Sequence, residues 1–105
     1  MKFQASPETD DDLIAARDFI TADNEKAALD FLDTVFEAFD RLGENPEMGA
    51  KARFKHAALK KMRYFVLPPP FNRWIILYQT SGKGVDIRRV LYGNINWKDE
   101  PGRFF

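Results

Sequence analysis

One segment near the C-terminus is apolar on both faces, and this limits the folds open to the chain. Residues 73–80 read as a β-strand in which Trp74 and Tyr78 share one face. Ile75 and Leu77 lie on the opposite face of the same strand. A strand with one face in water alternates apolar with polar residues instead. The sheet that contains this strand must therefore be covered on both faces, by other parts of the chain or by a partner.

Two further strands flank this segment and predict an antiparallel meander. Residues 62–67 precede it and residues 85–92 follow it, and each connection is short enough for a hairpin. The first connection holds the triple proline at 68–70, which cannot donate ladder hydrogen bonds and keeps the chain stiff and extended. An extended segment at residues 2–5 predicts one more strand, so we expect a sheet of about four strands.

Two amphipathic helices lie between the first strand and the meander. Ser6 is a good N-cap and Pro7 suits the first helical position, so the first helix starts there and runs to about residue 22. Asp23-Asn24 can cap a second helix that runs to about residue 42, with Gly43 just beyond its end. Two helices joined by so short a turn form an antiparallel hairpin over about residues 7–42. The predicted fold class is α+β, with this hairpin packed on one face of the antiparallel sheet.

The second face of the sheet has two possible covers. The C-terminal tail, residues 93–105, can fold back with Trp97, Phe104 and Phe105, or the face can stay open as an apolar patch for a partner. A tail of about a dozen residues that contains Pro101 and Gly102 makes a poor lid. The sequence therefore favours the partner.

The length and composition indicate one small domain, residues 1–105, without sulfur chemistry. The chain has no cysteine, which excludes disulfides, thiolate catalysis and sulfur metal sites. Its N-terminus has no apolar signal region, and nowhere do eighteen apolar residues follow one another. We expect a protein that is neither secreted by a signal peptide nor inserted in a membrane.

The formal net charge of zero hides an acidic half and a basic half. Residues 1–50 contain four Lys or Arg against thirteen Asp or Glu, a balance of −9, while residues 51–105 contain twelve against three, a balance of +9. Folded together, the halves either neutralise each other or give the molecule a strong dipole that steers a charged partner. Both alternatives fit the sequence.

The most basic stretch of the chain is residues 51–63. It contains no acidic residue, and its one histidine, His56, reads as a surface residue because a single histidine cannot build a metal site. Its six Lys and Arg residues can contact phosphates, or they can simply keep a connecting loop soluble. The cations are Lys51, Arg53, Lys55, Lys60, Lys61 and Arg63.

Arginines and tyrosines on adjacent strands are the only other side chains in the sequence that suggest a binding or catalytic role. No glycine-rich phosphate loop, metal-ligand cluster or Ser–His–Asp arrangement can be assembled, so no cofactor or metal is expected. Arginine clusters bind phosphate bidentately, and a tyrosine can move a proton. The same arginines can instead pair with the acidic helices or with an acidic partner. The residues are Arg63, Arg73, Arg88, Arg89, Tyr64, Tyr78 and Tyr92.

The order of strand, two helices and three-strand meander resembles the RelE/ParE superfamily of type II toxin–antitoxin toxins. The resemblance covers nearly the whole chain and rests on the order and spacing of short motifs. The matching residues are Ser6-Pro7, Asp12-Leu13, Ala27-Ala28, Phe31, Leu42, Asn45-Pro46, Gly49, Tyr78 and the run from Arg89 to Gly93.

This resemblance implies a small cytoplasmic bacterial toxin that is neutralised by a cognate, ParD-like antitoxin. The disordered C-terminal segment of such an antitoxin folds onto the toxin, and its N-terminal domain binds operator DNA, so the toxin reaches that DNA only through the antitoxin. Folding on binding suits a surface that is apolar with a basic rim. The partner-binding residues expected here are Arg73, Trp74, Tyr78, Arg88, Tyr92 and Trp97.

Two activities compete within the superfamily. ParE-like members poison DNA gyrase by protein contact, and the segment Val90-Leu91-Tyr92-Gly93 resembles theirs, although Tyr92 stands where they usually have histidine. RelE-like members cut messenger RNA on the ribosome; in that case Arg63 and Arg89 would bind phosphate and Tyr92 would transfer the proton. The chain ends without the histidine and tyrosine arrangement of several of these RNases, so the sequence favours the gyrase inhibitor. A third reading is an interaction module without toxicity.

Overall fold

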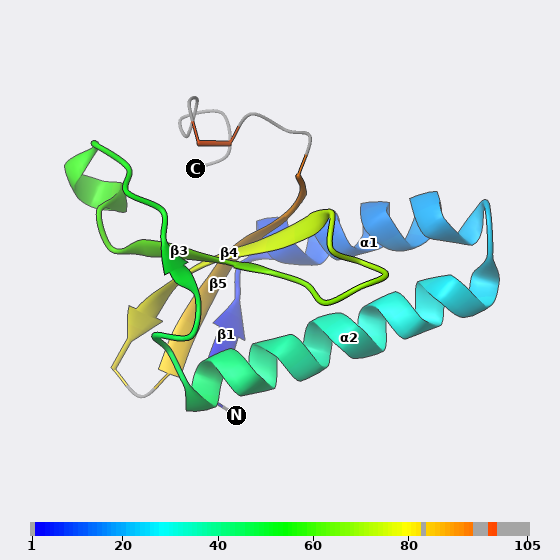
Figure 1. The fold of residues 1–105 in the computed structure, drawn as a ribbon, viewed down its shortest axis with the longest axis horizontal. Coiled ribbons are helices and arrows are strands. Elements are labelled where there is room, and N and C mark those ends of the chain that lie inside the picture. Colours follow the sequence, from blue (N-terminus) through cyan, green and yellow to red (C-terminus); the bar gives the residue numbers. More distant parts are fainter. Residues whose placement is uncertain (1, 83, 94–96, 99–105) are drawn as a thin grey trace.

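A computed structural model describes residues 2–82, 84–93 and 97–98. Helices α1 (Pro7–Thr21) and α2 (Glu25–Glu44) form a hairpin that packs on one face of a sheet (Figure 1). The strands are β1 (Phe3–Ala5), β2 (Ala50–Lys51), β3 (Met62–Val66), β4 (Trp74–Ser81) and β5 (Gly84–Tyr92), and a short 3-10 helix, η1, spans Ala57–Leu59. The predicted α+β fold is confirmed.

The sheet has five strands in the order β1-β5-β4-β3-β2. Strands β3, β4 and β5 form the predicted antiparallel meander, and their ends lie within one residue of the predicted ones. Two details differ from the expectation of about four antiparallel strands. The short strand β2 pairs with β3, and β1 runs parallel to β5.

The helix starts follow the sequence closely, whereas the end of α2 does not. The side-chain oxygens of Ser6 and Asn24 accept hydrogen bonds from the amides of Thr9 and Ala27, which caps both helices. Gly43, expected beyond α2, lies inside it. A Cβ atom on Gly43 would come within 2.9 Å of the Lys2 carbonyl oxygen, so glycine is needed here for close packing against the start of the chain.

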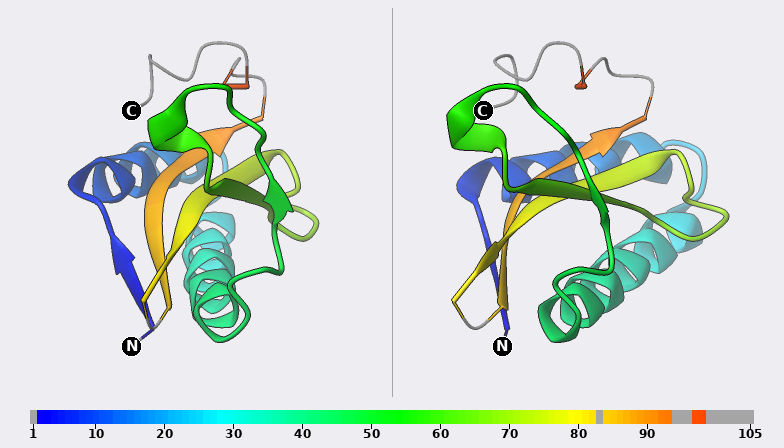
Figure 2. Two further views of the ribbon diagram at one scale, coloured as in Figure 1. Left: turned by 90° about the vertical axis from the view of Figure 1, so that its left-hand side faces the viewer. Right: turned by 60° about the vertical axis from the view of Figure 1, so that its left-hand side comes forward.

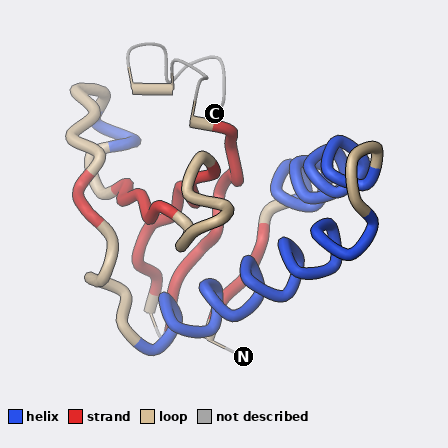
Figure 3. The backbone as a smooth tube through the Cα atoms, turned by 45° about the vertical axis from the view of Figure 1, so that its right-hand side comes forward, coloured by secondary structure: helices blue, strands red, loops and turns tan. Residues whose placement is uncertain are grey.

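The main core lies between the helices and the sheet, and aromatic side chains hold it together. The β3–β4 connection lies next to α2 (Figures 1 and 3). Its Phe71 ring packs edge-on against Phe31 of α2 with 5.3 Å between centroids, and Trp74 packs against the same Phe31 at 5.1 Å. Trp74, Ile76 and Tyr78 share one face of β4, as their alternation predicted, and this face packs on the core beneath the helices.

The opposite face of the sheet is covered, so the prediction of an open apolar patch for a partner is wrong. A second core buries Met62, Ile75, Leu77 and Leu91 beneath Phe54 and Trp97. Phe54 belongs to the segment around η1, which crosses the side of the sheet away from α2 (Figure 2). The rings of Phe54 and Trp97 meet edge-on at 6.0 Å. Of the expected tail cover, Trp97 takes part, while Phe104 and Phe105 lie outside the described residues.

Candidate functional site

Side chains of α1 and of its N-cap residue form hydrogen bonds along the edge of β5. Strand β1 pairs with β5 only at residues 85–87, which leaves the rest of that edge open. Ser6 Oγ donates to the Arg88 carbonyl at 2.8 Å, and the Val90 amide donates to Asp12 Oδ2 at 3.0 Å. Thr9, between them in the helix, donates to the same edge at 3.3 Å. Their spacing of three residues places all three on one side of α1 and fixes α1 against β5.

An ion pair reinforces this junction. Arg89 donates from Nε and Nη2 to the two carboxylate oxygens of Asp12, both at 2.7 Å. The side chains are only 20% and 12% exposed, so the pair is screened less than a surface pair. The hydrogen bond that Arg89 donates to Asp12 raises the pKa of Arg89, against an opposing effect of burial. Arg89 therefore stays cationic and holds α1 in place.

Next to this ion pair, an apolar groove of about 450 Å³ runs between α1 and the ends of β4 and β5. Phe19 of α1 is 70% exposed, and its ring lies 6.5 Å from that of Trp74. Tyr92 packs edge-on against Trp74 at 4.8 Å. The groove is lined by Asp12, Ala15, Ala16, Phe19, Trp74, Arg89, Val90, Leu91 and Tyr92.

Three of the predicted partner-binding residues meet at this groove. Trp74 and Tyr92 form its aromatic wall, and Arg73 Nη1 donates to the Tyr92 hydroxyl at 3.5 Å. Arg88 lies on the neighbouring edge of β5, where the β4–β5 register shifts and its carbonyl accepts from Ser6. Exposed aromatic and aliphatic surface beside arginines is typical of sites that bind another protein. We name this feature the aromatic groove.

Tyr78 is not part of this surface, contrary to the prediction. Its side chain is fully buried, and its hydroxyl donates to the Pro46 carbonyl at 2.8 Å and accepts from the Gly49 amide at 2.8 Å. Burial raises the pKa of Tyr78, and the Gly49 amide and Arg63 reduce that rise. Tyr78 therefore stays a neutral phenol near pH 7 and fixes the turn that follows α2.

Arg63 holds the same turn and lies away from Tyr92, another residue of the RNase hypothesis. Its Nη1 donates to the Gly49 carbonyl at 2.7 Å and to the Glu47 carbonyl at 3.3 Å. Along the sheet, Arg63 pairs with Tyr78, whereas Tyr92 pairs with Trp74, four residues earlier in β4. Four residues of strand span roughly 13 Å. The backbone positions of Arg63 and Tyr92 are therefore well separated along the sheet.

Trp97 also lies away from the groove, and His56 is exposed as expected. The Trp97 side chain is 5% exposed and contacts Tyr64 at 5.2 Å on the face that the helices leave uncovered. Its role is to bury the second core, which corrects its assignment to partner binding. His56 lies at the surface of the segment that precedes η1.

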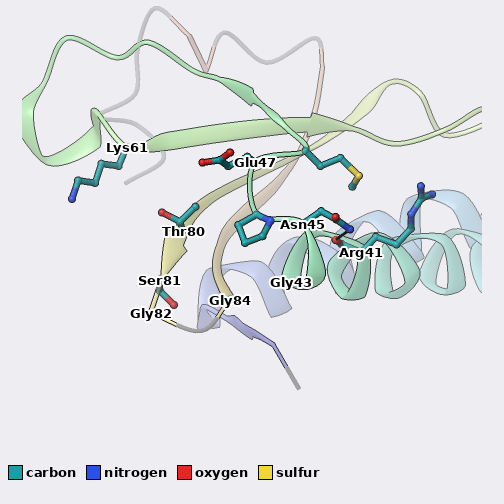
Figure 4. A pocket seen from close by; sticks show the side chains of 11 residues that line it. Arg41, Gly43, Asn45, Glu47, Lys61, Thr80, Ser81, Gly82 and Gly84 are labelled. Atoms are coloured by element: carbon teal, nitrogen blue, oxygen red, sulfur yellow. Dashed lines mark hydrogen bonds between the residues drawn. The ribbon is translucent and has the colours of Figure 1, made fainter.

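A larger hollow, of about 1220 Å³, opens between the C-terminal end of α2 and the β4–β5 turn (Figure 4). Its lining includes three charged residues from separate segments, namely Arg41, Glu47 and Lys61. No aromatic side chain lines it, and its charges are of both signs. The aromatic groove, although smaller, is therefore the better candidate for binding a partner.

Two classes of site receive no support in the described part of the chain. No three His, Cys, Asp or Glu side chains among these residues gather closely enough to hold a metal ion. Neither α1 nor α2 has the length and apolar character that a membrane-spanning helix requires.

The groove depends on two α1 residues, Asp12 and Phe19, for which the sequence predicted no role in a site. Phe19 lies beside the buried stripe of Leu13, Ala16 and Ile20, and this exposed aromatic position was the available signal. Asp12 continues the spacing of Ser6 and Thr9. The sequence alone does not show that this spacing turns the three side chains towards β5, because that depends on the path of α1 along the strand.

A helical hairpin on a three-strand meander, with an aromatic groove beside the first helix, defines a small α+β protein with a candidate protein-binding surface. The model of the family described as "ParE toxin of type II toxin-antitoxin system, parDE" matches residues 4–97, and the chain belongs to this family. The fold is similar to a solved chain of the chromosomal ParDE TA system from P. aeruginosa, with a TM-score of 0.68 and 18% identity over 88% of this chain and 95% of that one. A search of curated proteins found no match.

Proposed function

We propose that this chain is the toxin of a type II toxin–antitoxin pair, is neutralised by a cognate antitoxin, and inhibits DNA gyrase by protein contact in the bacterial cytoplasm. The observation that carries the proposal is the match of the ParE toxin family over residues 4–97. The resemblance to ParE-like sequences supports gyrase as the target.

The aromatic groove supports the antitoxin as a partner. It offers exposed apolar surface at Phe19 and Trp74, with Arg73 beside it. A disordered segment with apolar and acidic residues suits this combination, because it can bury the rings and pair with the arginine. The groove is the surface that such a segment would cover.

The hydrogen bonds of the arginine side chains favour inhibition by protein contact over RNA cleavage. Arg63 is engaged with backbone carbonyls, and Arg89 with the Asp12 carboxylate. A phosphate-binding arginine would have to give up these partners first. No feature of the described residues favours RNA cleavage over inhibition by contact.

Induction of the gene in a bacterium, with and without the neighbouring small reading frame, tests the proposal. We expect growth to stop when the chain is induced alone and to continue when both are induced. Purified gyrase should then lose supercoiling activity in the presence of the chain, while translated messenger RNA stays intact. Unaffected growth in both strains would refute a toxin, and RNA cleavage with normal supercoiling would refute the gyrase target.

A further inference from the structure

The acidic and basic halves of the chain do not neutralise each other in the basic segment, residues 51–61. Lys51, Arg53, Lys55, Lys60 and Lys61 are all exposed. None of these five side chains forms an ion pair with an acidic residue in the described part of the chain. The segment crosses the side of the sheet away from α2, whose outer surface carries acidic residues (Figure 2). The molecule thus keeps a separate cationic surface.

The basic segment turns its large apolar side chains inward and its charges outward. Phe54 is 6% exposed and belongs to the second core, and Leu59 packs against that core. Lys98 extends the cationic surface, because its Nζ lies 4.9 Å from the centre of the Tyr64 ring and 5.3 Å from that of Trp97. The large exposed apolar residues of the described chain lie elsewhere, in α1, α2 and at Val66.

We infer that the basic segment binds the phosphate backbone of duplex DNA without reading its sequence. Protein interfaces have few lysines and are anchored by aromatic residues, as the aromatic groove is, whereas phosphate contacts need exposed cations and no apolar anchor. Single strands are bound by stacking bases on aromatic rings, and here Trp97 is buried beneath Lys98. The choice of DNA over duplex RNA rests on the proposed function, since gyrase acts on duplex DNA.

This contact gives the chain an attachment to DNA that is separate from any antitoxin. It would raise the concentration of the chain near a target that is itself bound to DNA. Because the contact is electrostatic, its affinity must fall as salt rises, with a slope of about −0.9 in log K against log salt for each phosphate contact.

Fluorescence anisotropy of a labelled mixed-sequence DNA duplex, titrated with the full chain over a salt series, tests the inference. The variant carries Lys55→Gln and Lys60→Gln, two exposed residues of the basic segment. The control carries Lys26→Gln and Arg41→Gln, two exposed residues of α2, and changes the net charge equally. Loss of two phosphate contacts should reduce the salt slope by about 1.8 and weaken binding about tenfold or more at low salt. The control should bind as the unaltered chain does.

Several results would overturn the inference. These are no duplex binding by the unaltered chain, equal losses in the variant and the control, tighter binding of the single strand or of duplex RNA, and equally tight binding of a polyglutamate peptide of matched charge. The last result would indicate an acidic protein partner. Equal circular dichroism spectra and melting temperatures ensure that an unfolded variant is not mistaken for a negative result. The assay contains neither gyrase nor antitoxin, so its failure leaves the proposed toxin function standing, and loss of gyrase inhibition leaves DNA binding measurable.

Discussion

Phe19→Ala tests whether the aromatic groove is the surface that the antitoxin covers. An aromatic side chain can bury about 200 Å², and Phe19 is 70% exposed, which leaves roughly 140 Å² for a partner to cover. At about 25 cal/mol per Å², full coverage would contribute at most about 3.5 kcal/mol to binding. Ordering of the partner and imperfect packing reduce this contribution. We expect a loss of about 2 kcal/mol, or about 30-fold in Kd.

Isothermal titration of the purified chain with the product of the neighbouring reading frame measures this loss. The matched control is Phe36→Ala, an aromatic residue of α2 that is 47% exposed and lies outside the groove. Its Kd should change less than about threefold. Since Phe19 buries little of its surface in the free chain, the melting temperatures of Phe19→Ala and of the unaltered chain should agree within a few degrees.

The reasoning fails if Phe19→Ala binds the antitoxin as tightly as the unaltered chain. If Phe36→Ala alone weakens binding, the antitoxin covers the outer side of α2 instead. If neither variant changes the Kd, the antitoxin does not use the exposed rings of the helical hairpin. Either outcome would remove the aromatic groove from the proposed function.

Three further predictions concern the contacts that hold the site. Asp12→Ala leaves Arg89 and the Val90 amide without their acceptor. Because the ion pair is only partly buried, we expect urea denaturation to show that the free energy of unfolding falls by about 2–4 kcal/mol, and by less for Asp12→Asn. If Asp12→Ala is as stable as the unaltered chain, the ion pair does not hold α1. Tyr78→Phe should cost about 1–3 kcal/mol near pH 7. Because the pKa of Tyr78 is raised in the folded state, the unaltered chain loses stability as pH rises from about 10 through that raised pKa; the gap to Tyr78→Phe should therefore narrow there, and a constant gap would contradict the burial argument. Gly43→Ala would place a Cβ atom 2.9 Å from Lys2 and should lower the free energy of unfolding by about 1–3 kcal/mol. Gly82→Ala meets nothing within 4 Å and should change it by less than about 1 kcal/mol. If both variants change stability by less than about 1 kcal/mol, Lys2 can move away from the added Cβ atom at little cost.

Local sequence signals predicted the elements of this fold because caps and periodicity act within a few residues. Ser6 and Asn24 cap their helices as expected, and the strands of the meander lie within one residue of their predicted ends. The cover of the second face could not be predicted in this way. Phe54 lies in a segment rich in cations, and its burial involves a contact with Trp97, 43 positions further along the chain.

The roles of individual site residues depended on relations between elements. The alternation in β4 correctly placed Trp74 and Tyr78 on one face of the strand. It could not predict that the turn after α2 buries Tyr78 whereas Trp74, at the groove, stays half-buried. In β5, a register shift at the adjacent arginines breaks simple alternation. Whether Arg89 bound a phosphate or a carboxylate was decided by the path of α1, which brings Asp12 within 2.7 Å.

The aromatic groove and the basic segment differ in chemistry, and they share no residue. Distant sites with no shared partner act additively, so their variants should separate the two binding activities. Phe19→Ala should weaken antitoxin binding and leave the DNA salt slope unchanged, whereas the Lys55 and Lys60 substitutions should do the reverse. A chain with both changes should show the sum of the two losses. If instead the Lys55 and Lys60 substitutions weaken the antitoxin complex as much as Phe19→Ala does, an acidic antitoxin segment extends from the groove onto the basic segment, and the cations would then be part of the protein interface.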